Sequence, residues 1–183
     1  KYLAKPNIEI KCRALKAMSG VFIAHPRVFL TFHQEGTLTD ILSDESDDLL
    51  QIAALKCLKD ILEHEEIRVE SGEAKRQMEA NKGMTKSKKI SGDQDGDASL
   101  LGMCVLEHID RVYEMTTSLN PKIRLGSVLL LETVRRQGLS NPMTLIPVII
   151  ALLGDSTANE TKVAAKRILA EETEKNPKHV KQL

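Results

Sequence analysis

Four stretches of this 183-residue chain share one pattern of polar and small residues, and this pattern limits the possible fold more than any other feature. Each stretch opens with a polar residue suited to capping a helix. A long polar side chain follows three or four positions later, and a small residue comes three positions after that. The stretches are 7–18, 47–58, 120–131 and 159–170, with Lys11, Gln51, Arg124 and Lys162 at the first shared position and Ala14, Ala54, Ser127 and Ala165 at the second.

The spacing of these stretches predicts stacked helical hairpins. Lys11 and Gln51 are 40 positions apart, and Arg124 and Lys162 are 38 positions apart. Gln51 and Arg124 are separated by 73 positions, about one period plus an insertion. Periods near 40 residues with two helices each are typical of HEAT and armadillo repeats, in which neighbouring hairpins bury each other's apolar sides. The alternative is an ordinary helical bundle whose spacing is accidental.

Composition agrees with an all-α fold. Hydrophobic residues make up 42% of the chain, which is ample for a core, but aromatic residues make up only 3% and Trp is absent. Leu, Ala, Glu and Lys are plentiful, and these residues favour helices over strands. The sequence therefore predicts an α-solenoid of HEAT-type hairpins that occupies residues 1–183 as a single segment. Because it begins at Lys1 rather than Met, we expect it to be a piece of a larger protein.

The periodicity of apolar residues predicts seven helices. Asn120-Pro121 and Asn141-Pro142 each place a capping residue before a proline in the first helical turn. Pro147 falls inside a helical pattern, so it should kink that helix or begin its firm part. The expected helices cover 7–24, 27–43 with a break near Gly36, 47–63 with a charged extension towards 82, 98–118, 121–137, 142–153 and 159–175.

The uncharged run at 143–153 is too short to cross a membrane, which takes about 20 residues. We expect it to be a buried helix between its hairpin mate at 158–175 and the preceding repeat, because a helix that is apolar all round meets little water. No membrane association is predicted.

Residues 83–97 differ from the rest of the chain. They contain three glycines, little apolar surface and blocks of opposite charge, which predicts a disordered or mobile loop. Hydroxyl groups next to lysines make the loop a candidate for phosphorylation, which would weaken any phosphate contact made there. The lysines are Lys86, Lys88 and Lys89, and the hydroxyl residues are Thr85, Ser87 and Ser91.

No enzyme or metal-site signature is present. The acidic run at Asp93, Asp95 and Asp97 lacks the glycine and glutamate of a calcium loop, and the five histidines are scattered without metal-ligand spacing. The sequence also lacks a nucleophile motif and a phosphate loop. The dispersed Cys12, Cys57 and Cys104 fit core thiols in a reducing compartment. We expect no cofactor and no catalytic activity.

The net charge of zero excludes a polybasic nucleic-acid arm, but local basic groups remain. Phosphate contact by such groups would be independent of base sequence and sensitive to salt. The scarcity of aromatic residues argues against stacking of single-stranded bases. The candidate contact residues for DNA or a protein partner are Lys86, Lys88, Lys89, Arg135, Arg136, Lys162, Lys166 and Arg167.

Two segments carry a resemblance to a known family. The segment from Val134 to Val180 keeps an order of Gln137-Gly138-Leu139, Asn141-Pro142, Pro147, Asp155 and Ala164-Ala165, and it resembles the C-terminal part of the Nipped-B family. The segment 20–62 is similar to another stretch of that family through Gly20, Phe22, Ile23, His25, Pro26, Ile41, Leu42, Ser43 and Asp44.

The Nipped-B resemblance implies the large HEAT-repeat subunit of the cohesin loader. Such a protein is expected in the nucleus on chromatin, where it contacts the kleisin and SMC subunits of cohesin and grips duplex DNA. It stimulates the SMC ATPase without a catalytic centre of its own, and its partner subunit binds outside this segment. The alternative is a helical-repeat scaffold of the karyopherin, phosphatase-scaffold or condensin-subunit type that binds only protein.

Overall fold

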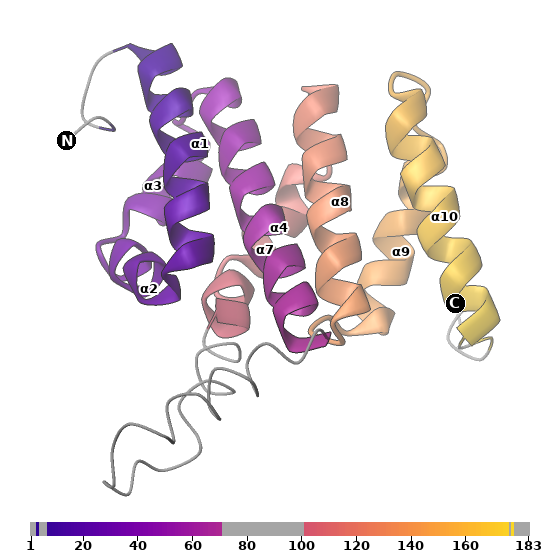
Figure 1. The fold of residues 1–183 in the computed structure, drawn as a ribbon. Helices are drawn as coiled ribbons and strands as arrows, with labels where there is room; N and C mark the ends of the chain where they lie inside the picture. Colours follow the sequence, from indigo (N-terminus) through magenta and orange to yellow (C-terminus); the bar gives the residue numbers. More distant parts are fainter. Residues whose placement is uncertain (1–2, 4–6, 71–100, 176, 178–183) are drawn as a thin grey trace, which may run out of the picture.

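The computed structural model of the chain describes residues 3, 7–70, 101–175 and 177. These residues form helices joined by turns, and none of them lies in a strand (Figure 1). The prediction of an all-α fold is therefore confirmed for this part of the chain. The predicted loop at 83–97 lies outside the described residues.

Four helices lie side by side and run in the same direction (Figure 1). At one end the side-chain amide of Asn120 donates to Asp48 over 2.8 Å, and at the other end Arg136 lies 2.7 Å from Glu66. Because the start of α4 meets the start of α8 and their C-terminal parts also meet, these two helices are parallel. The four helices are α1 (Ile8–Ala24), α4 (Asp48–Glu70), α8 (Pro121–Arg136) and α10 (Asn159–Lys175), and each begins within one of the four aligned stretches.

Shorter helices precede each of the later members of this row and pack against it. α2 (Pro26–Gln34) contacts α1, and α3 (Thr37–Leu42) contacts α4. α7 (Ile109–Met115), which follows the helical residues 101–106, contacts α8. α9 (Pro142–Leu152) contacts both α8 and α10. The chain therefore alternates between the row of parallel helices and the helices packed against it.

Side-chain caps stand at the starts of α1, α4, α8 and of the helix that follows Asn141, as the sequence predicted. The side-chain oxygens of Asn7, Asp47, Asn120 and Asn141 each accept a hydrogen bond from the backbone amide two residues further on, over 2.8–3.0 Å. These bonds satisfy amides that have no partner within the helix. The break predicted near Gly36 is also confirmed, because Gly36 has a φ of 73° between α2 and α3.

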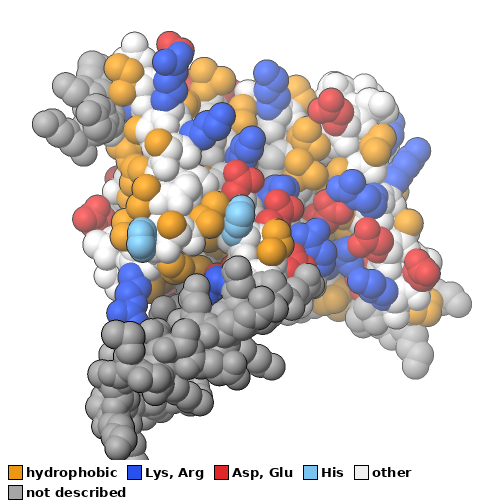
Figure 2. Space-filling view, viewed as in Figure 1, with side chains coloured by type: hydrophobic (Ala, Val, Ile, Leu, Met, Phe, Trp, Pro, Cys, Tyr) orange, Lys and Arg blue, Asp and Glu red, His pale blue; other side chains and the backbone are white. Residues whose placement is uncertain are grey.

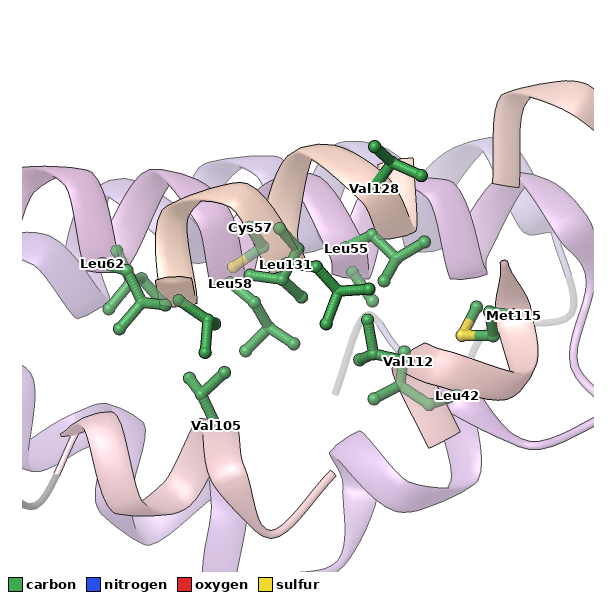
Figure 3. Packing of buried hydrophobic residues seen from close by; sticks show 14 of the residues in the cluster. Leu42, Leu55, Cys57, Leu58, Leu62, Val105, Val112, Met115, Val128 and Leu131 are labelled. Carbon is green, nitrogen blue, oxygen red and sulfur yellow. The ribbon is translucent and has the colours of Figure 1, made fainter. Parts of the chain in front are cut away.

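Three of the four small residues of the aligned stretches are fully buried, whereas Ala14 is half-buried. Ala54, Ser127 and Ala165 are each 0% exposed. The Ser127 hydroxyl is satisfied within its own helix, because it donates to the Ile123 carbonyl over 2.9 Å. Larger apolar side chains from the row meet those of the shorter helices to form the core. Figure 3 shows part of this core, with Leu55, Leu58 and Leu62 of α4, Val128 and Leu131 of α8, and Leu42, Val105, Val112 and Met115 from the shorter helices.

The single helix predicted over 98–118 is wrong within the described residues, because the chain breaks between helix 101–106 and α7. His108 adopts φ −104° and ψ 6°, outside helical values. Its side chain is buried and its Nε2 lies 3.3 Å from Nδ1 of His33 in α2. At the point where the regular helix is interrupted, His108 thus has a polar contact with His33, a residue 75 positions away.

The helix predicted at 142–153 is confirmed, but Pro147 lies within it rather than at the start of its firm part. α9 begins at Pro142, so residues 142–146 form regular helix rather than a loose first turn. Pro147 lies on the exposed side, where water can reach the carbonyl group left without an amide partner. The expectation that α9 is buried all round is wrong for one side. Leu145, Ile146, Ile149 and Leu152 are buried, whereas Met143 and Ile150 are each 42% exposed.

Candidate nucleic-acid and partner interface

The row of parallel helices presents one broad surface that carries many charged side chains (Figure 2). Blue and red side chains alternate over the lower part of α4, α8 and α10. We call this surface the parallel-helix face and define it by Lys16, Lys56, Lys59, Glu63, Glu66, Lys122, Glu132, Arg136 and Arg167.

Arg136 and Arg167, two of the predicted contact residues, lie on this face but are paired with carboxylates. Arg136 lies 2.7 Å from Glu66 and 3.6 Å from Glu63 of the neighbouring α4. Arg167 lies 2.6 Å from Glu132 of α8. Hydrogen bonds to these carboxylates raise the pKa of both guanidinium groups. A phosphate would have to displace a carboxylate at either arginine.

Arg135 has a different environment. Its side chain is only 6% exposed, and it forms ion pairs with Glu171 and with Glu172, the latter at 3.4 Å. Glu172 is itself buried, so the pair neutralises a charge that would be costly to leave alone. Arg135 therefore joins α8 to α10, and its predicted role as a DNA contact would require it to leave both carboxylates.

The remaining predicted cations do not gather with these arginines. Lys162 is half-buried, and the exposed Lys166 borders a shallow, open depression together with Leu153 and Leu169. Lys86, Lys88 and Lys89 lie outside the described residues. The structure therefore brings Arg136 and Arg167 onto one face, but it does not unite the predicted contact residues into one site, and their contact with DNA or a partner stays a prediction.

The sequence reading passed over two lysines of the parallel-helix face. Lys16 of α1 and Lys56 of α4 are exposed, and neither has an ion-pair partner in the part of the chain that the structure describes. The signal that could have found them is their spacing of 40 positions, the same as that of Lys11 and Gln51.

The residues that carry the family resemblance lie at junctions between helices. The Gln137 side-chain amide donates to the Leu62 carbonyl of α4 over 2.7 Å. Gly138 follows with a φ of 71°, a left-handed conformation that a side chain would strain. Leu139 then packs against Gly102, where an added methyl group would lie 3.2 Å from its Cδ1. The Gln-Gly-Leu motif thus ties the end of α8 to α4 and to helix 101–106.

Asp155, another residue of the resemblance, links α8 to the turn before α10. Its carboxylate accepts hydrogen bonds from the hydroxyl and the backbone amide of Thr157, both over 2.7–2.8 Å, and from Arg124 over 2.8 Å. The bonds from Thr157, followed by those from Arg124, lower the pKa of Asp155 to about 2. Arg124 also donates to the Ser118 carbonyl over 2.7 Å. Arg124, at the first shared position of its aligned stretch, therefore joins the turn before α8 to the turn before α10.

Asp44, from the other segment of the resemblance, has a similar role. Its carboxylate lies 2.5 Å from Arg111 of α7, and the same arginine donates to the Leu42 carbonyl over 2.7 Å. Hydrogen bonds to Glu114 and Asp44 outweigh burial and raise the pKa of Arg111. The matched motifs are thus structural at both ends of the described chain.

The three cysteines are free thiols, and Cys57 and Cys104 are buried. Burial raises the pKa of the Cys57 thiol to about 11, so it stays protonated and is a poor nucleophile. No cluster of His, Cys, Asp and Glu side chains within the described residues could hold a metal ion. None of the described helices is long and apolar enough to span a membrane.

Residues 103–182 match the family model Nipped-B_C, described as Sister chromatid cohesion C-terminus. The match runs from helix 101–106 through α7, α8, α9 and α10 and includes the Gln-Gly-Leu motif and Asp155. It does not reach the similar segment at 20–62. No curated protein matches the chain.

Proposed function

We propose that the protein is part of a factor that loads cohesin onto chromatin. The reason is that residues 103–182 match the Nipped-B C-terminal family model, whose description is Sister chromatid cohesion C-terminus. The protein binds the kleisin and SMC subunits of cohesin together with duplex DNA, and it stimulates the SMC ATPase in trans. The family match is the observation that carries this proposal. The factor acts in the nucleus, on chromatin.

The fold proposed for this function is a HEAT-type α-solenoid. Four parallel helices begin at the four aligned stretches, and shorter helices pack against them in chain order. Ala54, Ser127 and Ala165 occupy equivalent buried positions, and Arg124 joins one turn to the next. Equivalent residues in equivalent places support a stack of repeated hairpins rather than a bundle with accidental spacing.

Such a solenoid acts by binding rather than by chemistry of its own. The described residues offer lysines on one face and buried polar junctions between repeats, and the raised pKa of Cys57 does not suit nucleophilic attack. DNA contact would involve the phosphate backbone, since the chain contains no Trp and few other aromatic residues on which bases could stack. The hydrolysed ATP belongs to the SMC subunits.

A second candidate function is a repeat scaffold that binds only protein. The neutralisation of Arg135, Arg136 and Arg167 by carboxylates favours it, as does the net charge of zero. Both features predict weak DNA binding by this chain alone.

Two measurements on the 183-residue chain separate these functions. The first is an electrophoretic shift of a short duplex between about 50 and 200 mM salt, and the loader predicts weak binding that falls steeply with salt. The second is co-precipitation with purified kleisin and SMC subunits, together with their ATPase rate. Binding to neither duplex nor cohesin would overturn the loader assignment. Cohesin binding without any duplex binding would leave a protein-binding subunit.

A further inference from the structure

We propose that Lys16 and Lys56 form a phosphate-contacting pair on the parallel-helix face, with Lys122 at its border. This inference rests on the duplex binding proposed above and assigns it to residues. It places the contact on α1 and α4, away from the arginines of α8 and α10 that the sequence favoured.

The fold sets these two lysines next to each other. Lys16 and Lys56 occupy equivalent positions in the first two aligned stretches, and α1 packs directly against α4 in parallel. In α4, Lys56 lies between the exposed Leu49 and Ile67, at steps of seven and eleven residues that keep one side of a helix. Lys56 therefore points away from the core, and the exposed Lys16 holds the equivalent position of the neighbouring helix.

The distance between adjacent helices suits a nucleic-acid backbone. Packed helices lie about 8–10 Å apart, and one strand of a duplex carries a phosphate about every 3.4 Å along the axis. Two lysines on adjacent helices can thus reach separate phosphates of the same strand. Lys122, exposed in the first turn of α8, extends the basic surface across a third helix.

The lysines of the parallel-helix face differ from its arginines in the groups that a bound phosphate would displace. The lysines in question are Lys16, Lys56 and Lys122. None of the three has an ion-pair partner among the described residues, so a phosphate replaces only water and small ions. At Arg136 and Arg167 the phosphate would have to displace Glu66 or Glu132. Favourable release of small ions is therefore concentrated at the three lysines.

A duplex fits this surface better than a single strand. The described phenylalanines, Phe22, Phe29 and Phe32, are buried, and Tyr113 belongs to α7 outside the parallel-helix face. Flexible lysines without aromatic neighbours can hold regularly spaced charges but cannot stack bases or read them.

The test measures fluorescence anisotropy of a labelled duplex with the 183-residue chain over a range of salt concentrations. We expect Lys16→Gln with Lys56→Gln to lower the slope of log affinity against log salt by about 1.8, which corresponds to two lost phosphate contacts. The matched control, Arg27→Gln with Lys175→Gln, removes the same charge from exposed positions of α2 and α10 and should leave the slope unchanged. The variant with Lys16→Arg and Lys56→Arg should retain the slope of the unmodified chain, because arginine keeps the positive charge.

The outcomes separate this inference from the proposed function. If the unmodified chain binds duplex and the Lys16/Lys56 double variant keeps its slope, the pair is not the contact, although loader function stands. If the unmodified chain binds no duplex at any salt, duplex binding by this chain fails, and the pair fails with it. If the double variant loses binding to polyglutamate but not to duplex, the surface serves an acidic protein segment and the proposal is overturned. Circular dichroism and the thermal midpoint of each variant establish that it is folded.

Discussion

The contact between α8 and α10 and the contact between α1 and α4 join parallel helices of the same kind in different ways. Arg135 and Arg167 connect α8 to α10 through three carboxylates, Glu132, Glu171 and Glu172. Between α1 and α4 the described residues form no ion pair, and the contact includes a hydrogen bond between the Ser19 hydroxyl and the Cys57 thiol. The two ends of the row of parallel helices therefore differ in how charged side chains join neighbouring helices.

The N-terminal region has a polar link of another kind. His33 of α2 lies 2.8 Å from Glu107 and 3.3 Å from His108, and these two residues form the break before α7. Arginine stays charged over the whole physiological pH range, whereas histidine titrates within it. The difference between the two ends thus predicts that salt acts mainly on the C-terminal contacts and acid mainly on the N-terminal ones.

The largest expected effect comes from Arg135→Met. This change leaves Glu172 buried without its arginine, so the free energy of unfolding should fall by about 3 kcal/mol. Urea denaturation followed by circular dichroism measures it. Adding Glu172→Leu should restore much of the loss, because no charge then remains buried. A loss below about 1 kcal/mol for Arg135→Met would mean that the pair contributes no more than an exposed one.

Acid should destabilise the break between helix 101–106 and α7. Burial, followed by the nearby His33, lowers the pKa of His108 below its ordinary value, and Glu107 opposes this shift only in part. The unfolded chain therefore binds the proton more tightly, and this contribution to stability is complete above pH 6.5 and declines as the pH falls towards the lower folded value. Urea midpoints at successive pH values measure it. In His108→Gln the decline between neutral and mildly acidic pH should be smaller, and an equal decline in both proteins would contradict this assignment.

Arg167→Met tests the salt dependence of the C-terminal contacts. The Arg167 side chain is 54% exposed, so loss of its pair with Glu132 should cost less than about 1 kcal/mol at low salt. The difference from the unmodified chain should shrink further in concentrated NaCl, because salt screens exposed charges. Stability measured in both salts checks this, and a cost that does not change with salt would mean that Arg167 acts through packing.

Lys56→Met should have the smallest effect on folding. Lys56 is exposed and has no ion-pair partner within the described part of the chain, so the free energy of unfolding should change by less than about 0.5 kcal/mol. The same urea experiment measures this change. A large loss would show that the lysine supports the contact between α1 and α4, and would weaken its assignment to phosphate binding.

Much of the fold follows from local signals in the sequence. Asn7, Asn120 and Asn141 mark helix starts because capping involves only residues two or three positions away, and Gly36 marks a break for the same reason. The break at His108 was missed because its cause, His33, is 75 positions distant. No local pattern reports a contact of that range.

The candidate site was less accessible to sequence reading than the fold. Arg135 and Arg136 are adjacent and look alike in sequence, yet one side chain is 6% exposed and the other 42% exposed. The exposure of each arginine depends on the neighbouring helix that it faces. Arg135 faces α10 and Arg136 faces α4, and the sequence around them does not report how α8 packs between these two helices. Lys16 and Lys56, in contrast, could have been selected by asking which cations recur at the repeat spacing.

The common direction of α1, α4, α8 and α10 has an electrostatic consequence. Backbone dipoles in each helix add up to a partial positive charge at its first turn and a partial negative charge at its last turn. In an up-and-down bundle neighbouring dipoles oppose each other, but here four first turns share one border of the row (Figure 1). The row is therefore a polarised layer, and acidic side chains at the first turns, such as Glu9, Asp48 and Glu160, offset its positive border.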